Sequence, residues 1–223
     1  MPLIDSPTEL TTSATDLLLA VECALLVFWL GRSPTGDPWR RGLWCWVFGL
    51  MAVCSGLGAL AHGWDLAEAT RNLLWKPLYL GSGIFVALFL VGVVADWGQR
   101  ARAPRLVPWS VGLGVAFYAA TELFQGAFRV FVVYEGAALA GALLAYTALA
   151  LRQRLQGAAF LGLGVLVSLI GAGLQASQVS LHLLLPFDHN GVFHLMQLVG
   201  NALLGLGARQ AIARHSQQPP ALF

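Results

Sequence analysis

Charged side chains are scarce in this sequence. Asp, Glu, Lys and Arg make up 11% of its 223 residues, whereas hydrophobic residues make up 57%, and the mean hydropathy is +0.70. A soluble domain of this composition would expose large apolar patches, so the scarcity of charge excludes a soluble globular protein. A clustered basic face is also lacking, which excludes a nucleic-acid partner although the isoelectric point is about 8.6.

Lysine and cysteine are rare as well. The single lysine, Lys76, lies at the outer start of the third apolar run, which excludes a retinal Schiff base on the seventh. The three cysteines, Cys23, Cys45 and Cys54, form no C-x-x-C spacing, and we interpret them as packing residues. Residues 1–16 contain no Lys or Arg, so they lack the cationic region of a cleavable signal peptide. We therefore expect the first apolar run to be retained.

Long apolar runs separated by short polar breaks dominate what is present. A transmembrane helix needs ~20 predominantly apolar residues to cross a bilayer core of ~30 Å. We predict an all-α, polytopic membrane protein with seven transmembrane helices at about 15–31, 43–63, 74–95, 106–124, 128–151, 157–184 and 189–211. The predicted organisation is an extracytoplasmic segment over 1–14, a transmembrane domain over 15–211 and a cytoplasmic tail over 212–223.

Positive charge is unevenly distributed among the breaks. Cytoplasmic loops of membrane proteins carry an excess of Lys and Arg. Only Arg71, Lys76 and Arg129 lie at the end of the bundle where the second run leads into the third and the fourth into the fifth, which leaves ten of the 13 Lys and Arg on the other side. Those ten are Arg32, Arg40, Arg41, Arg100, Arg102, Arg105, Arg152, Arg154, Arg209 and Arg214. The asymmetry predicts an N-terminus outside and a C-terminus in the cytoplasm.

Polar residues are concentrated in the predicted outer halves of the runs. The inner halves, such as 25–30 and 137–151, hold almost nothing ionisable. A polar group at membrane depth is costly unless it faces the bundle interior or a wet cavity. Glu22 and Glu135 lie about two turns inside their spans, so we expect both to face the interior, with Arg129 neutralising Glu122 or Glu135. The pattern predicts a polar cavity that opens outward above an apolar inner half.

The seventh run places its polar residues on one face. Asn190, His194, Gln197 and Asn201 are spaced four, three and four residues apart, which is helical periodicity. The Asp188-His189-Asn190-Gly191 segment that opens this run contains two favourable N-cap residues, Asp188 and Asn190. We therefore predict that this face lines the cavity. The predicted ligand-binding residues are Asn190, Gln197 and Asn201 from the seventh run, with Gln178 and His182 from the sixth.

Three histidines are predicted to meet at the outer end of the bundle. His62 closes the second run, and His189 and His194 open the seventh, so their imidazoles can share a metal ion, with His182 as a substitute. His189 and His194 are about 140° apart on an ideal helix, so both reach one ion only if the chain is not yet helical at His189. A hydrogen-bonded interface role for each histidine and a haem-ligating pair are the alternatives.

The arrangement resembles the CREST superfamily of alkaline ceramidases, progestin and adipoQ receptors and haemolysin-III-like proteins, and is closest to its uncharacterised bacterial members. The resemblance is carried by seven helices, by His62 at the end of the second, and by the Asn-Gly-Val-Phe-His segment at 190–194. In that family a second-helix histidine and a seventh-helix His-x-x-x-His pair hold zinc. Here Asn190 replaces the first histidine of that pair, Gly58 stands where a serine is expected, and no aspartate lies within the third run.

The resemblance implies a zinc-dependent membrane hydrolase that acts on a lipid amide or ester. Zinc lowers the pKa of a bound water to near 7, and a nearby carboxylate then orients a histidine or accepts the proton. The implied zinc ligands are His62, His189 and His194, and the implied catalytic residues are Glu22, Asp65 and Ser55.

A non-enzymatic function is the alternative. The same cavity suits a seven-helix protein that binds or senses a lipid or small molecule, with a structural metal or none. A transporter comes third, because the sequence has no internal repeat and no pair of broken helices. The short loops, the preference for Arg over Lys and the richness in Ala, Gly and Leu are typical of a bacterial inner-membrane protein.

Overall fold

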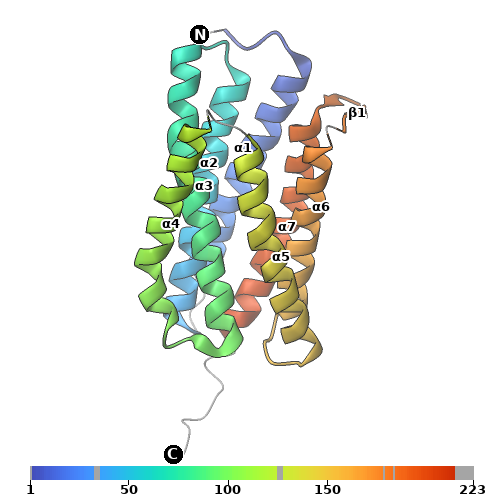
Figure 1. Cartoon of the computed structure of the whole chain (residues 1–223). Helices are drawn as coiled ribbons and strands as arrows, with labels where there is room; N and C mark the ends of the chain where they lie inside the picture. The colour runs from blue at the N-terminus through green and yellow to red at the C-terminus, as the bar shows by residue number, and fades with distance from the viewer. Residues whose placement is uncertain (1, 33–35, 125–127, 178, 183, 214–223) are drawn as a thin grey trace, which may run out of the picture.

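Seven long helices run alternately up and down along one common direction (Figure 1). The structure is a computed structural model, and it describes residues 2–32, 36–124, 128–177, 179–182 and 184–213. All seven helices are long and apolar enough to cross a membrane, so the chain is an all-α integral membrane protein, as predicted. The elements are α1 (Pro7–Gly31), α2 (Pro38–Gly63), α3 (Glu68–Val94), the π-helical turn η1 (Ala95–Gln99), α4 (Ala103–Leu123), α5 (Phe128–Leu151), α6 (Ala158–Ala176), β1 (Leu181–His182), β2 (Pro186–Phe187) and α7 (His189–Ala213).

The first helix begins earlier than the predicted residue 15. Pro7 occupies its first turn, and the Ser6 side chain caps it by accepting a hydrogen bond from the Glu9 backbone N–H at 3.4 Å. Hydropathy marks only the apolar stretch of a helix, whereas the cap sets where the helix starts. Part of the segment predicted as extracytoplasmic, 1–14, is therefore the beginning of α1. Of the predicted tail, 212–223, the last ten positions, 214–223, lie outside the described residues.

The sixth helix ends at Ala176, so the predicted helical span of 157–184 is wrong beyond that residue. The chain instead forms a short antiparallel hairpin, in which Leu181 pairs with Phe187 and His182 with Pro186. The 19 residues of α6 already span ~28 Å at 1.5 Å per residue, close to the thickness of a bilayer core. The apolar run in the sequence is longer than the helix, since it also includes Leu184 and Leu185, which lie exposed in the hairpin.

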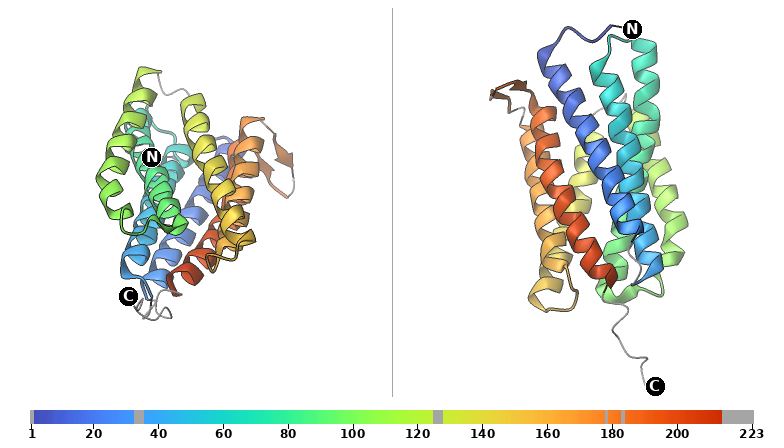
Figure 2. Two further views of the ribbon diagram at one scale, coloured as in Figure 1. Left: turned by 60° about the horizontal axis from the view of Figure 1, so that its bottom comes forward. Right: turned by 180° about the vertical axis from the view of Figure 1, so that it is seen from behind.

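Helix packing follows chain order and closes through α1 and α7. Neighbouring helices pack on one another from α1 to α4 and from α5 to α7, α1 also packs on α7, and α5 contacts α3 and α4 only sparsely. Figure 2 shows α1 and α7 side by side from behind. Helices α6 and α7 approach closely at two glycines, because a Cβ on Gly164 would lie 2.8 Å from the Gly200 carbonyl oxygen.

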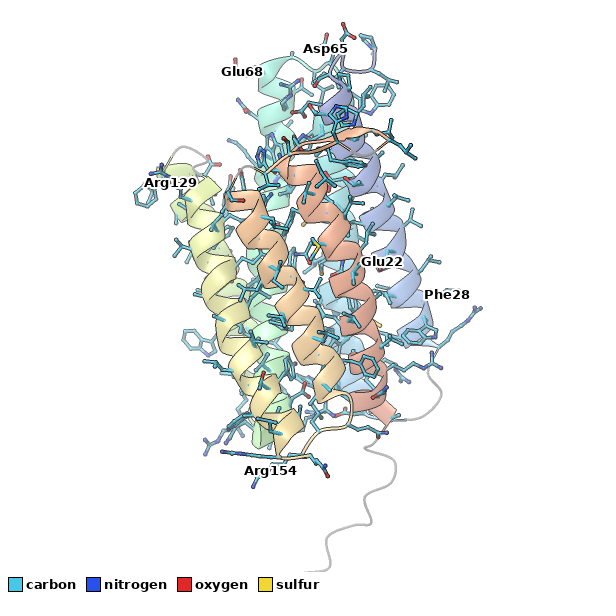
Figure 3. All side chains as sticks on the ribbon, turned by 90° about the vertical axis from the view of Figure 1, so that its right-hand side faces the viewer. Glu22, Phe28, Asp65, Glu68, Arg129 and Arg154 are labelled. Atoms are coloured by element: carbon cyan, nitrogen blue, oxygen red, sulfur yellow. The ribbon has the colours of Figure 1, made fainter. Side chains whose placement is uncertain are left out.

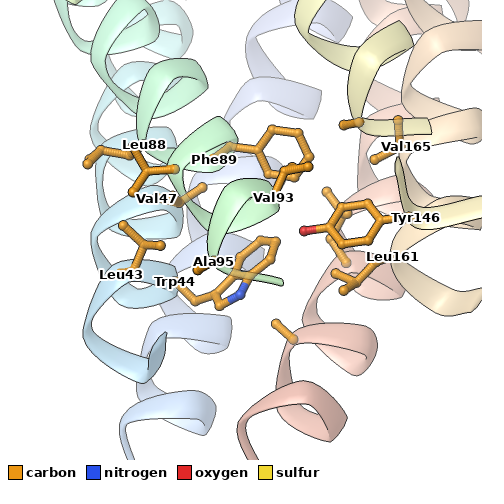
Figure 4. Packing of buried hydrophobic residues seen from close by; sticks show 14 of the residues in the cluster. Leu43, Trp44, Val47, Leu88, Phe89, Val93, Ala95, Tyr146, Leu161 and Val165 are labelled. Carbon is orange, nitrogen blue, oxygen red and sulfur yellow. The ribbon is translucent and has the colours of Figure 1, made fainter. Parts of the chain in front are cut away.

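We name the two ends of the bundle after the ends of the chain that lie there. The N-side end is where α1 begins and where α2 passes into α3 and α6 into α7; the C-side end is where α7 ends (Figure 1). Hydrophobic side chains fill the half nearest the C-side end. Figure 4 shows their packing from close by. Trp44 is central there, with its ring centroid 5.6 Å from that of Phe48 and 6.0 Å from that of Phe89. The sequence predicted this apolar half.

Two buried aspartates at the C-side end are paired with arginines. Asp37, the N-cap of α2, receives two hydrogen bonds from Arg100, at 2.7 Å from Nε and 3.0 Å from Nη2. Arg40 Nη2 lies 2.7 Å from Asp96 Oδ1, and the Tyr146 hydroxyl donates to Asp96 Oδ2 at 3.0 Å. These contacts join α2, η1 and α5. Sequence reasoning did not foresee this buried ionic network beneath the apolar half.

Candidate functional site

A cavity of about 510 Å³ occupies the half of the bundle nearest the N-side end. It reaches that end, because His62 and His189 line it and lie at the last turn of α2 and the first turn of α7. The lining comes from six of the seven helices, and α4 contributes none of it. The lining residues are Asp16, Leu19, Met51, Cys54, Ser55, Gly58, His62, Trp75, Leu78, Tyr79, Ser82, Phe85, Phe131, Glu135, Gln175, His189, Asn190, Phe193, His194, Gln197 and Asn201. The structure thus contains a polar cavity in the predicted half.

All three histidines predicted to meet line this cavity. His62 is held by a carboxylate, since its Nδ1 lies 2.7 Å from Glu9 Oε2. Its ring also contacts the edge of Trp75, with centroids 5.3 Å apart. Glu9 was missed in the sequence because it precedes the predicted first span. His189 is the first residue of α7, so the chain is already helical there.

His194 lies deeper, between α7 and α1. Its Nδ1 is 3.0 Å from Thr15 Oγ1, whose hydroxyl is within reach of the Thr11 and Thr12 carbonyl oxygens at 3.0 and 2.9 Å. A hydroxyl that donates to a backbone carbonyl leaves its oxygen as an acceptor, so we infer that Nδ1 carries the imidazole hydrogen. The other nitrogen, Nε2, then faces Asp16 Oδ1 at 3.5 Å.

Asp16 is the most important lining residue that sequence reasoning missed. It is 5% exposed, and its carboxylate fits against Gly58, where an added Cβ would come within 2.6 Å of Oδ2. Gly58 is the position at which the resemblance expected a serine, and the space left by the missing side chain holds the Asp16 carboxylate. The sequence does contain a signal for the early start of this helix. Ser6-Pro7-Thr8-Glu9 has the capping-box pattern, which begins the helix at Pro7 and places Asp16 well inside it.

Glu135 on α5 is the second acidic residue of the lining. It is 6% exposed, and among the described residues no side chain or backbone group donates a hydrogen bond to it. Arg129, predicted as a partner for Glu122 or Glu135, does not pair with either: Glu122 lies 3.8 Å from Lys76 instead. The prediction that Glu135 faces the interior is confirmed.

The predicted seventh-helix face lines the cavity as expected. Gln175 Nε2 donates to Asn190 Oδ1 at 2.8 Å, and the Ser168 hydroxyl donates to Gln197 Oε1 at 2.7 Å, so α6 supports two of these amides. Of the two candidate N-caps, Asp188 is the one that caps α7, by accepting from the Gly191 N–H at 2.8 Å. Asn201 is 1% exposed at the base of the cavity.

Several predicted site residues do not line the cavity. Asp65 lies exposed at the N-side end, and Glu22 lies about halfway along α1, beside Asn201 (Figure 3). His182 belongs to the exposed strand β1. Gln178 lies outside the described residues. Of the predicted catalytic residues, only Ser55 lines the cavity.

The histidines do not form a metal centre in this arrangement. Across the described part of the chain, no three His, Cys, Asp or Glu side chains come close enough together to hold one ion. His62 and His194 instead contact Glu9, Thr15 and Asp16 through their ring nitrogens. The residues as placed do not fit a three-histidine zinc site, so we derive no chemical step through zinc.

Comparison with known proteins gives one match. A family model described as "Family of unknown function (DUF6962)" matches residues 11–213, which include α2 to α7, most of α1 and every cavity residue. Neither the characterised proteins nor the solved structures give a match.

Proposed function

The chain belongs to DUF6962, a family of unknown function, and we propose from its geometry that it is a membrane protein that binds a small molecule or lipid in the N-side cavity. The supporting observation is the cavity itself. Its volume of about 510 Å³ is typical of small-molecule sites, and its lining combines aromatic walls with a few polar groups that converge on one space.

In the proposed orientation this cavity opens toward the extracytoplasmic side of the membrane. Ten of the 13 Lys and Arg belong to the predicted cytoplasmic side, and the positive-inside rule then puts the N-side end outside. We propose the bacterial inner membrane as the location. Ligand enters the cavity from the outer face or the outer leaflet.

Mass spectrometry of ligand retained by the purified protein tests the binding function. Ser55→Trp places a large side chain inside the cavity. The control is Val53→Trp, which introduces the same side chain two residues away, at a position that is 60% exposed on the outside of α2. We expect a small molecule or lipid that co-purifies with the parent and with Val53→Trp and is lost from Ser55→Trp. A retained species that is identical in all three proteins contradicts the proposal.

A zinc-dependent hydrolase of CREST type is the second candidate, because one observation favours it. The contact between His62 Nδ1 and Glu9 is the carboxylate–histidine pairing that commonly orients a zinc ligand, and it leaves Nε2 of His62 without that partner. Elemental analysis of the parent beside a His62→Ala, His194→Ala double variant tests it. About one zinc per chain, lost in the variant, supports this candidate and justifies a screen for lipid-amide and ester hydrolysis; metal absent from both removes it.

A further inference from the structure

We infer that the N-side cavity binds an organic cation, in which an ammonium group is held by Asp16 and Glu135 and an apolar body lies against the aromatic wall. This inference rests on the proposed binding function and adds the chemical class of the ligand. It arises from three features of the cavity: its unpaired carboxyls, its lack of cationic side chains and its aromatic residues.

The two carboxyls receive no hydrogen bond from the part of the protein that the structure describes. Asp16 and Glu135 are 5% and 6% exposed, and within the described residues neither accepts a hydrogen bond. His194 Nε2 lies 3.5 Å from Asp16 Oδ1, which is longer than a typical hydrogen bond of ~2.7–3.2 Å. Buried carboxyls are normally paired, because burying an unpaired charge is costly. A ligand that donates N–H groups supplies what both carboxyls lack.

The charge balance of the lining selects a cation over an anion. The lining contains two carboxyl groups and no Lys or Arg. Its only other titratable bases are the three histidines, of which His62 is already engaged by Glu9. A protonated His194 would compensate Asp16 alone, because Glu135 projects from α5 without an imidazole contact. An anionic ligand would meet two carboxyls without an arginine or lysine to offset them.

Aromatic side chains complete the site. Trp75, Tyr79, Phe85, Phe131 and Phe193 line the cavity, and the Trp75 and Tyr79 rings stack with centroids 6.1 Å apart. Aromatic faces attract ammonium groups within ~6 Å by their quadrupole, and they also pack against apolar ligand atoms. A wall of rings beside two carboxyls therefore favours an amphipathic amine over an inorganic cation.

Calorimetric titration of the full chain in zwitterionic nanodiscs tests the assignment with three probes of one shape. Phenethylamine is the cation, 2-phenylethanol the neutral analogue and phenylacetate the anion. Each is titrated into the parent, Asp16→Asn, Glu135→Gln and the matched control Glu122→Gln, which changes a 45% exposed carboxylate outside the cavity. Thermal unfolding of each unliganded variant verifies that it is folded.

We expect the parent to bind phenethylamine roughly ten-fold or more tightly than 2-phenylethanol, because hydrogen bonds from an ammonium group to a carboxylate are stronger than those from a neutral hydroxyl. Glu135→Gln and Asp16→Asn should lose most of that preference, and Glu122→Gln should keep it. A parent without preference for the amine overturns the assignment, as does a preference that survives both substitutions. Equal binding of all three probes leaves the cavity as a ligand site, whereas no binding of any probe counts against the proposed function too.

Discussion

Two pairs of buried carboxyl groups lie at opposite ends of this bundle, and the protein stabilises only one pair. At the C-side end, Asp37 and Asp96 are 2.7 Å from the guanidinium groups of Arg100 and Arg40. At the N-side end, Asp16 and Glu135 face a cavity and accept no hydrogen bond from the described residues. The buried carboxylates at the C-side end have arginine partners within the described residues, and those facing the cavity do not. The unpaired groups at the cavity are thus the better candidates for contact with a ligand.

The paired end should be the more sensitive to substitution. Asp96→Ala leaves Arg40 buried beneath the apolar half without its partner, and breaking a buried ion pair costs roughly 3–5 kcal/mol. We expect a large fall in the melting temperature of the detergent-purified protein. Glu68→Ala, on an exposed carboxylate at the opposite end (Figure 3), is the control and should leave the melting temperature unchanged. Equal effects of the two substitutions would show that the Arg40–Asp96 pair contributes little.

Gly58→Ala tests whether the cavity end depends on the position of Asp16. The new Cβ would lie 2.6 Å from Asp16 Oδ2, and overpacking of this kind costs about 1–3 kcal/mol. The melting temperature should fall, and Asp16→Ala in the same chain should restore it because the clash is removed. Gly56→Ala on the same helix, where nothing lies within 4 Å, is the matched control. Without that rescue, the contact between α1 and α2 at Gly58 is not what limits stability.

Glu135→Leu should have the opposite sign from Asp96→Ala. Glu135 has no hydrogen-bond or ion-pair partner among the described residues, so no group loses a partner when it is replaced. An apolar side chain there should stabilise the unliganded protein by about 1 kcal/mol, the lower end of the penalty for an unsatisfied buried group. The same substitution should abolish preferential binding of phenethylamine. Glu122→Leu, on an exposed pair, serves as the comparison for both readouts. A loss of stability on the scale of Asp96→Ala would mean that Glu135 serves the fold.

Acid should weaken the paired end gradually. Burial acts to raise the pKa of Asp37, but hydrogen bonds from Arg100 and the Arg40 backbone and the charges of both arginines outweigh it and lower the pKa from 3.8 to about 2. A carboxyl with a lowered pKa in the folded state contributes stability that is present above pH 3.8 and is lost as the pH falls toward 2. Melting temperatures over this range should fall more steeply for the parent than for Arg100→Gln. Parallel curves for the two proteins would exclude Asp37 as a source of acid sensitivity.

Much of the fold could be read from the sequence, because a bilayer imposes long apolar runs whatever the tertiary contacts are. Seven runs predicted seven helices, and the polar spacing from Asn190 to Asn201 predicted the face of α7 that lines the cavity. Boundaries were less predictable. Caps such as Ser6 extended helices beyond their apolar parts, and the apolar Leu184 and Leu185 lie in a hairpin that hydropathy alone did not distinguish from helix.

The sequence by itself determined the class of the protein, the number of its helices and the end of the bundle at which polar groups collect, because these depend on local composition and helical periodicity. Only the tertiary structure decided which carboxyls are paired. Asp37 is 63 positions from Arg100, and Asp16 meets Gly58 and His194 on other helices. Pairing depends on contacts between distant segments, and those contacts decide whether a buried charge stabilises the fold or stays available to a ligand.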